Sequence, residues 1–479
     1  METENVFLRV VDMLARYHVN RKEGDFVAYH EPDELRKLLK LDEEDKPGDL
    51  ESLLGWVKKY LYYAVRTGNP GYCNRMWAGA NLPSIIGEMV AAVSNTSACT
   101  FETAPVSTLM EQFMIQEMLS LVGFENGSGQ MTTGSSNANM IAMMAARYRA
   151  CPESKSQGLC NARPLRGFVN KDAHYSMDRA AVILGIGTDN LIKVPTDNHG
   201  RMDARNLAGK LAEAQAAGTL PFFVAATAGT TVRGAFDQLA PLLALRDQYD
   251  FWLHVDGAWG GAVVLSERLR QQFLPLLEQV DSFTLDFHKM PGTALMCNIL
   301  LFNNSSALFK EICSAGDESY IFREGEDGTV RDLGTLSLQC GRRVDSLKWF
   351  LDWKFFGRKG LARRVEHYLE LCTYAEQCII DNPLLEMVAP RESYNVCFRH
   401  IIPEGQDDEA FIRALRTRMQ TGKRGLIGIG YVDGTLALRL LVTNTSIGRR
   451  EIRQILDNIC LTAREISEEI QRRIPALEN

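Results

Sequence analysis

An alternation of short apolar runs with helical stretches, between residues 96 and 345, constrains the fold more than any other feature of this sequence. Strands that are apolar almost throughout are typical of a parallel sheet that helices cover on both faces. The sequence therefore predicts an α/β fold with a mostly parallel central sheet. The expected strands are GFVN, NLIKVP, FFVAATAG, FWLHVDGA, SFTLDFH and MCNILLF, and the expected helices include NANMIAMMAARYRA and MDARNLAGKLAEAQAAG.

The stretches on either side of this region have other patterns. Residues 1–95 are expected to be helical, and apolar residues recur at helical spacing along METENVFLRVVDMLARYHVN, which indicates a docking helix rather than a signal peptide. Residues 346–479 contain two long helical stretches, two strand patterns and a last helix. We therefore expect an N-terminal helical segment (1–95), a large domain (96–345) and a small C-terminal α+β domain (346–479).

Charge, hydropathy and cysteine spacing argue against several functions. Lys+Arg 53 against Asp+Glu 60 gives a net charge of −7 without a basic block, which is atypical of a nucleic-acid surface. No uninterrupted apolar run reaches the roughly 18 residues of a membrane span. The 11 cysteines include no C-x-x-C pair, and we interpret them as scattered thiols of a protein in a reducing compartment. We expect a cytoplasmic protein that binds neither nucleic acid nor membrane and holds no metal.

Two predicted strand ends carry residues suited to amine and carboxylate chemistry. Asp256 follows one buried strand, and His288 and Lys289 follow another. Buried lysines are rare unless they are paired or functional, and a deprotonated lysine forms a Schiff base with an aldehyde. A carboxylate on a neighbouring strand end could keep a ring nitrogen protonated. Pyridoxal phosphate requires this pairing of lysine and carboxylate.

A glycine turn before a helix could hold the phosphate of such a cofactor. The segment TTGSSNAN (132–139) places a glycine and small hydroxyl residues directly before a predicted helix, whose N–H groups and positive end attract an anion. Taken alone, each feature has a simpler interpretation: the segment would be a plain helix cap, Asp256 would be a turn residue, and Lys289 would be a surface residue. Their joint order on a predicted parallel sheet favours the cofactor site.

Several longer motifs resemble the fold-type-I, pyridoxal-phosphate-dependent amino-acid decarboxylases, and within them the glutamate and cysteine-sulfinate decarboxylases. The resemblance implies that family's fold, its decarboxylation of an amino acid, and a homodimer with active sites at the subunit interface. The motifs are FETAPVSTLMEQ (101–112), HYSMDRAAVILGIGTDN (174–190), FFVAATAGTTVRGAFD (222–237), HVDGAWGG (254–261), HKM (288–290) and LQCGRRVDSLKWFLDW (338–353).

The resemblance also implies a role for individual residues. Lys289 would form the Schiff base, Asp256 would pair with the pyridine nitrogen, and His174 would stack on the ring. Tyr320 falls in a polar segment, GDESYIFREGEDGTVRD (316–332), which would form a mobile lid and return a proton to the substrate carbon. The alternative for Tyr320 is an ordinary loop tyrosine. The other implied cofactor contacts are Ser135 and Ser136 at the phosphate, Thr230 beside the ring, and His288.

The substrate is less determined by the sequence. Arg439 alternates with apolar residues on a predicted strand, and the resemblance implies that it meets the distal carboxylate of glutamate. Arg75 would add a second cation, with Ala78 nearby in the pocket; the alternative is that the side chain of Arg75 turns outward to solvent. We expect an acidic L-amino acid, glutamate first, with aspartate or cysteine sulfinate next. The alternatives are a decarboxylase of a non-acidic or unusual amino acid, and a catalytically silent scaffold.

Four residues depart from the pattern of the resembling decarboxylases. Asp286 replaces an asparagine that helps to hold phosphate, and a carboxylate there would repel the phosphate unless it hydrogen-bonds a hydroxyl or turns away. Gly257 replaces an alanine that packs against the ring. Met296 and Asn298 replace a glutamine and a serine in the following strand. We expect these changes to affect the substrate more than the cofactor.

Overall fold

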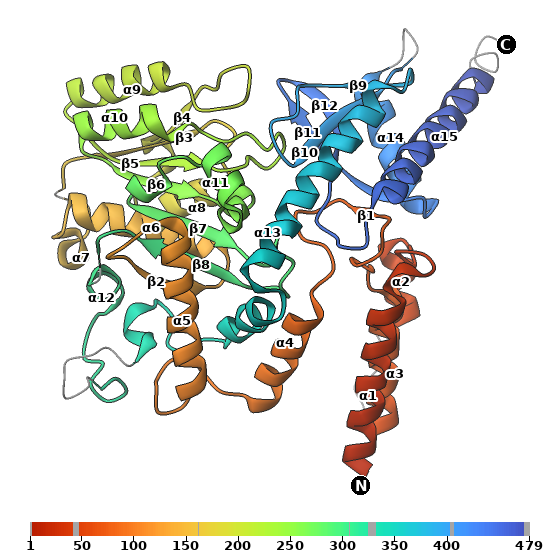
Figure 1. Cartoon of the computed structure of the whole chain (residues 1–479), viewed down its shortest axis with the longest axis horizontal. Helices are drawn as coiled ribbons and strands as arrows, with labels where there is room; N and C mark the ends of the chain where they lie inside the picture. Colours follow the sequence, from red (N-terminus) through yellow and green to blue (C-terminus); the bar gives the residue numbers. More distant parts are fainter. Residues whose placement is uncertain are drawn as a thin grey trace. The chain divides into compact units, whose positions relative to one another are not determined.

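The computed structural model describes residues 2–41, 47–160, 162–305, 307–323, 332–402 and 407–473. The chain forms two compact units (Figure 1). The large unit comprises Ala80–Glu370 and Pro390–Asn395, and the small unit comprises Met1–Gly79, Leu371–Ala389 and Val396–Asn479. Each unit is built from segments that are separate along the chain but pack together in space. The three regions expected from the sequence remain a prediction of the domain organisation.

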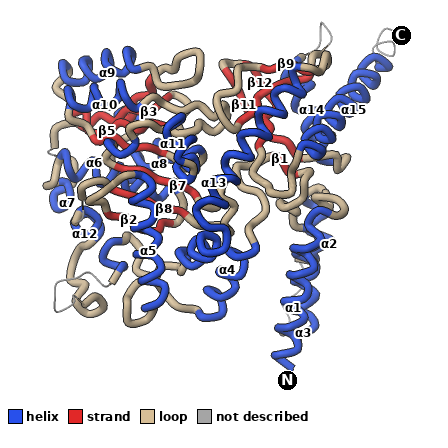
Figure 2. Tube along the Cα trace, in the orientation of Figure 1, coloured by secondary structure: helices blue, strands red, loops and turns tan. Residues whose placement is uncertain are grey.

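A seven-stranded sheet forms the centre of the large unit (Figure 2), and its strands lie in the order β2-β8-β7-β6-β5-β3-β4 (Figure 1). The five strands from β7 to β4 run parallel to one another, and β8 runs antiparallel to both β2 and β7. This arrangement confirms the predicted α/β fold with a mostly parallel sheet. The strands are β2 (Ser128–Thr132), β3 (Leu165–Asn170), β4 (Leu191–Val194), β5 (Leu220–Thr227), β6 (Trp252–Asp256), β7 (Ser282–Asp286) and β8 (Asn298–Phe302).

Helix α6 (Ser135–Ala150) packs closely on this sheet because its inner face carries small side chains. Ala138, Ala142 and Ala145 are fully buried in a core cluster that also includes Val169 of β3 and Leu300 of β8. Such close packing fixes the first turn of α6 against the strand ends. The other helices of the large unit include α4 (Leu82–Ser94), α5 (Pro105–Val122), α8 (Ser176–Ile183), α9 (Ala204–Ala216), α10 (Leu239–Tyr249), α11 (Glu267–Phe273) and α12 (Leu308–Cys313).

The two long helices expected after residue 345 form a single element, α13 (Asp345–Ile380), with a break. The break lies at Gly357, whose φ of 65° and ψ of 164° are not helical. Glycine adopts a positive φ without the steric cost that a Cβ brings. The expected end of the first helix at this glycine is therefore confirmed.

The small unit contains a five-stranded sheet in the order β1-β11-β12-β10-β9. The β11–β12 hairpin turns at Asp433 and Gly434, which both have positive φ, as a two-residue hairpin turn requires. The strands are β1 (Tyr72–Cys73), β9 (Leu385–Met387), β10 (Asn395–His400), β11 (Leu426–Val432) and β12 (Thr435–Leu441). The helices are α1 (Glu2–Val19), α2 (Pro32–Leu39), α3 (Leu50–Tyr63), α14 (Asp408–Thr421) and α15 (Arg449–Arg473).

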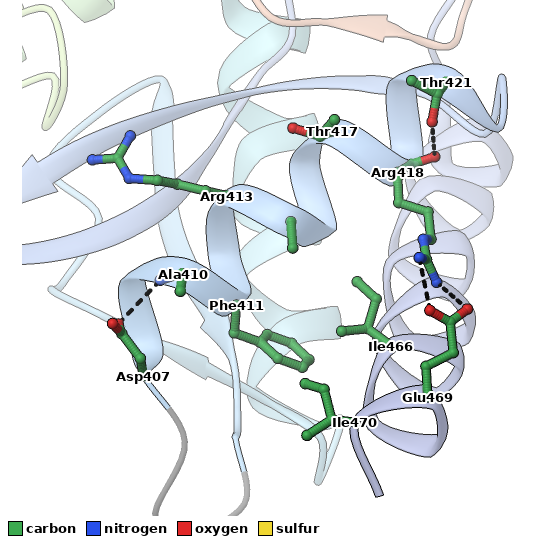
Figure 3. A pocket seen from close by; sticks show the side chains of 11 residues that line it. Asp407, Ala410, Phe411, Arg413, Thr417, Arg418, Thr421, Ile466, Glu469 and Ile470 are labelled. Atoms are coloured by element: carbon green, nitrogen blue, oxygen red, sulfur yellow. Dashed lines mark hydrogen bonds and ion pairs between the residues drawn. The ribbon is translucent and has the colours of Figure 1, made fainter. Parts of the chain in front are cut away.

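A surface groove lies between α14 and α15 in the small unit (Figure 3). Phe411, Ile466 and Ile470 form its apolar floor, and Arg418 and Glu469 are joined by an ion pair of 2.6 Å at its side (Figure 3). None of the described residues that line this groove is a candidate site residue.

Two further findings concern the described part of the chain only. No helix there is both long enough and apolar enough to cross a membrane. Nor do the described residues include a group of three or more His, Cys, Asp or Glu side chains that could hold a metal ion.

Candidate active site

The sheet of the large unit places the expected strand-end residues along one edge. Asp256 is the last residue of β6, and it aligns with Thr227 of β5 and Thr284 of β7. Asp286 is the last residue of β7, and Lys289 follows three residues later. Ligands of open α/β sheets bind at the carboxyl ends of the strands, so this edge is the candidate active site.

Both carboxylate oxygens of Asp256 accept hydrogen bonds from buried donors. Oδ1 accepts from the backbone N–H of Ala258 at 3.1 Å, and Oδ2 accepts from Nδ2 of Asn139 at 2.9 Å. Asp256 is only 4% exposed, and Asn139 on α6 is fully buried. Two fixed donors hold the plane of the carboxylate in one orientation, because neither donor can follow a rotation of the group.

Asn139 is itself oriented by its neighbours. Its two amide hydrogens point to Asp256 and to Oγ of Ser176, each at 2.9 Å, so its oxygen is left as an acceptor. That oxygen lies 3.0 Å from Nε2 of His254. Nε2 of His254 must therefore carry a hydrogen and donate it to Asn139.

The same network continues behind His254. Burial lowers the pKa of His254 to about 4, so the ring is neutral at pH 7 and its Nδ1 carries no hydrogen. Nδ1 accepts from the hydroxyl of Ser282 at 2.8 Å, and that hydroxyl accepts from Nε1 of Trp252 at 2.7 Å. We call this series of hydrogen-bonded side chains the Asp256 relay; it runs from Trp252 through Ser282, His254 and Asn139 to Asp256. In every bond of the relay the hydrogen is donated in the direction of the Asp256 carboxylate. Hydrogen bonds aligned in this way reinforce one another.

His254→Phe tests whether the relay acts on catalysis or only on stability. Phenylalanine keeps the ring packing against Phe223, whose centroid lies 6.1 Å away, but it removes both ring nitrogens. We expect kcat to fall about tenfold with little change in KM, because Asn139 then holds Asp256 less firmly. His254→Gln should restore part of kcat, since its amide can donate to Asn139. Equal kcat in the wild type and His254→Phe, measured by steady-state kinetics, would limit the relay to a structural role.

Lys289 and Asp286 form an ion pair at the end of β7. Nζ of Lys289 lies 3.0 Å from Oδ2 of Asp286, whose side chain is 3% exposed. Oδ1 of Asp286 accepts from the backbone N–H of Ser135 at 3.2 Å and from Nδ2 of Asn298 at 2.8 Å. Asp286 thus forms bonds within the protein with both of its oxygens. Asp286 and Asn298, which both depart from the pattern of the resembling decarboxylases, are direct partners.

His174 lies in the same neighbourhood. Burial lowers the pKa of its imidazole, while the charges of Asp256 and Asp286 raise it and that of Lys289 lowers it. Nδ1 of His174 accepts from the backbone N–H of Ser176 at 3.3 Å, which leaves Nε2 as the donor of the neutral ring. The structure therefore brings together the histidine, the lysine and the carboxylates that the sequence singled out.

His288 is held against the strand that follows it. Its Nδ1 lies 2.8 Å from the carbonyl oxygen of Cys297 and 3.1 Å from the N–H of the same residue. Burial lowers the pKa of His288, although Asp286, at 3.8 Å from Nε2, raises it. A neutral His288 in this position supports the turn that carries Lys289.

The glycine turn before α6 has the geometry expected of an anion cradle. Gly134 has a φ of 106°, which favours glycine, and it precedes the first helical residue, Ser135. Ser136 is exposed at the helix start, whereas Ser135 is buried and its Oγ accepts from Asn298 at 2.9 Å. Ser136 thus faces solvent at the start of α6, whereas the backbone N–H of Ser135 is already bound to Asp286.

Thr230 and Tyr320 have very different environments. Thr230 is 1% exposed, and its Oγ1 accepts from the backbone N–H of Ala235 at 3.0 Å in the loop after β5. Tyr320 is 84% exposed. Residues 324–331 of the expected lid (316–332) lie outside the described residues.

The expected substrate residues belong to the small unit. Arg439 on β12 is 6% exposed and donates to the carbonyl oxygen of Asn74 at 2.9 Å, while Arg75 is exposed and Ala78 is buried. Burial lowers the pKa of Arg439, and the charge of Arg75 lowers it further. The same two causes lower the pKa of Arg416 on α14. Three guanidinium groups therefore concentrate positive charge in this part of the small unit.

The structure gives Gly257 a different role from the one expected. A Cβ at this position would lie 2.5 Å from the ring of Phe283 and 2.6 Å from the carbonyl oxygen of Thr284. A side chain would therefore collide with β7, and packing against that strand explains the glycine without any reference to a cofactor ring.

These residues fit pyridoxal phosphate. An amine for the aldehyde, Lys289, and a fixed buried carboxylate for the ring nitrogen, Asp256, lie at the same sheet edge, and the turn at Gly134 with the start of α6 suits a phosphate. His174 supplies a half-buried aromatic face in the same neighbourhood.

Comparisons with known proteins agree with this fit. The pyridoxal-dependent decarboxylase conserved domain matches residues 32–401. Cysteine sulfinic acid decarboxylase of Mus musculus is 35% identical over 452 residues, which cover 91% of this chain and 91% of that protein. Acidic amino acid decarboxylase GADL1 of Xenopus tropicalis is 33% identical over 91% of this chain and 88% of its own length. The crystal structure of mouse CSAD matches with a TM-score of 0.92 and 32% identity, over 96% of this chain and 98% of that one. With a likeness that extends over almost its whole length, this chain belongs to the pyridoxal-phosphate-dependent amino-acid decarboxylases.

Proposed function

We propose that this enzyme removes the α-carboxyl group of an acidic L-amino acid and releases carbon dioxide and the amine. The observation that carries the proposal is the positive charge concentrated around the buried Arg439, because guanidinium groups bind carboxylate or sulfinate oxygens in pairs. The names of the relatives support the same class, and they favour cysteine sulfinate ahead of glutamate, which the sequence placed first.

In this proposal, bound pyridoxal phosphate supplies an aldehyde and a ring that accepts the electron pair left by carbon dioxide. Lys289 holds the aldehyde, Asp256 keeps a proton on the ring nitrogen, and His174 covers the ring face. Tyr320 returns a proton to the substrate carbon. The remaining cofactor contacts that we propose are Ser135, Ser136, Thr230 and His288.

We also propose a cytoplasmic homodimer. Exposed apolar side chains on α1 and α3 support a subunit interface there, since Phe7 is 53% and Tyr60 is 73% exposed in the single chain. Sedimentation of the purified enzyme tests this part of the proposal, and a monomer at micromolar concentration would contradict it.

The function is tested by measuring carbon dioxide and amine release from cysteine sulfinate, aspartate and glutamate in parallel. We expect turnover of at least one of the three. Cofactor bound without turnover of any of them would contradict the acidic substrate and favour a non-acidic amino acid. A chain that binds no cofactor would instead favour the silent scaffold.

Arg439→Gln tests the proposed role of the arginines. We expect KM for the acidic substrate to rise about 10- to 100-fold, because a charge-assisted hydrogen bond contributes about 1.5–3 kcal/mol. Arg413→Gln is the matched control, since Arg413 on α14 is exposed and pairs with Glu409 and Tyr431. An unchanged KM in Arg439→Gln would remove Arg439 from substrate binding, and Arg75→Gln would then be measured in the same way.

A further inference from the structure

Asp286 is a buried carboxylate aimed at the reactive amine. Its Oδ2 lies 3.0 Å from Nζ of Lys289, whereas Oδ1 is bound by the N–H of Ser135 and the amide of Asn298. One oxygen is thus fixed by the protein interior and the other faces Lys289. A carboxylate placed in this way stabilises positive charge on the nitrogen of Lys289.

Asn298 fixes the orientation of Asp286. The register of β2, β8 and β7 places Thr132, Asn298 and Asp286 side by side on adjacent strands. The hydroxyl of Thr132 donates to Oδ1 of Asn298, so the Nδ2 of Asn298 faces Asp286. Asp286 is therefore locked between β8 and the first turn of α6, and it does not turn away into solvent.

The surrounding charges leave Lys289 as the cation that Asp286 faces most closely. Burial raises the pKa of Asp286, but the charge of Lys289 and the hydrogen bonds from Lys289 and Ser135 lower it, and the net shift is downward, so the group is ionised at neutral pH. Burial keeps His288 neutral, because its pKa is lowered. His174 carries little charge for the same reason.

Two more charged groups lie around this pair. Asp256, on the neighbouring strand, acts on His174, as Asp286 does. Lys348 acts on His288, but its ammonium forms ion pairs with Asp345 at 2.8 Å and with Glu88 at 3.0 Å. Asp256 accepts hydrogen bonds from Asn139 and Ala258, and Lys348 is paired with Asp345 and Glu88, so among these described groups no other cation replaces Lys289 as the partner of Asp286.

We propose that Asp286 is the counter-ion of the Lys289 nitrogen, both as the free ammonium group and after that nitrogen is bound to the cofactor. The proposal rests on the proposed function, in which Lys289 holds the cofactor. In the attachment, the neutral amine adds to the aldehyde carbon, the aldehyde oxygen leaves as water, and the new C=N nitrogen takes up one proton. Asp286 stabilises that proton, which makes the carbon more open to attack by the substrate amine.

The test is a pH titration of the visible absorption band of the cofactor bound to Lys289, in the wild type and in Asp286→Asn. An opposite charge at this distance shifts a titration by about 1–3 pH units. We therefore expect the protonated band of Asp286→Asn to disappear at a pH lower by about 1–3 units. Asp352→Asn is the matched control, because this buried carboxylate bonds to Asn81 and Thr293 and not to Lys289. Its midpoint should equal that of the wild type.

The possible results separate this inference from the proposed function. Equal midpoints in the wild type and Asp286→Asn would overturn the inference and leave the function intact. A folded wild type that shows no such band, and no adduct on Lys289 after borohydride reduction, would overturn the function itself. If Asp286→Asn does not fold, Asp286→Asn/Asn298→Ser replaces both partners together, and the same downward shift is expected in it. An unshifted midpoint in the double variant would equally refute the counter-ion role.

Discussion

Lys289→Ala is expected to abolish decarboxylation, with a loss of about three orders of magnitude or more, because the residue that holds the aldehyde is removed. Carbon dioxide release measures the rate. Borohydride reduction followed by peptide mass spectrometry shows where the cofactor is attached, and in the wild type we expect the adduct on Lys289. Activity within tenfold of the wild type, or an adduct on another lysine, would contradict this assignment.

The ion pair with Asp286 gives Lys289→Ala a second expected effect. Removing the ammonium group leaves a carboxylate that is 3% exposed without its partner at 3.0 Å. We expect the cofactor-free variant to lose about 1–3 kcal/mol of stability, since a buried charge is left unpaired. Lys289→Ala/Asp286→Asn should recover this stability in denaturant unfolding but should remain inactive. Recovery of stability without activity separates the chemical role of the lysine from its structural role.

Where the signal is local, the sequence predicts where the candidate residues lie in the fold. Each of the six apolar runs forms a strand, and parallel strands necessarily bring Asp256 and Lys289 to the same edge. The strand β2 was missed because Ser128, Gly129 and Gln130 interrupt its apolar pattern. Its place in the sheet follows from pairing with β8, which no local pattern encodes.

The sequence could not show the hydrogen bonds and ion pairs of the site that join residues far apart along the chain. Asn139 lay within the glycine-turn motif, and His254 within a strand motif, but their hydrogen bond joins residues 115 positions apart. The available signal was a polar residue with apolar neighbours on both sides, since Asn139 stands between Ala138 and Met140 and His254 between Leu253 and Val255. Asp286 was expected to repel the phosphate unless it hydrogen-bonded a hydroxyl or turned away, and only the register of three strands shows that Asn298 and Lys289 occupy its oxygens.

Asp256→Asn is expected to lower kcat by about two to three orders of magnitude, although the two side chains are almost equal in size. The change removes the negative charge that keeps the ring nitrogen protonated. It also leaves one donor unsatisfied, because Asn139 and Ala258 each donate to a different oxygen of Asp256 and an amide has only one oxygen. That second effect should cost about 1–3 kcal/mol of stability.

Asp237→Asn separates the two effects of Asp256→Asn. Asp237 is another buried aspartate of the large unit, whose pKa burial raises to about 6, and it accepts from the N–H groups of Met202 and Thr227. We expect its replacement to reduce stability by a similar amount while kcat changes less than about threefold. If both variants lost kcat equally, the loss in Asp256→Asn would come from disturbed folding. A large loss in Asp256→Asn alone would show that the charge of Asp256 acts on the reaction, and the relay through Asn139 and His254 would then be the means by which the fold holds that charge in place.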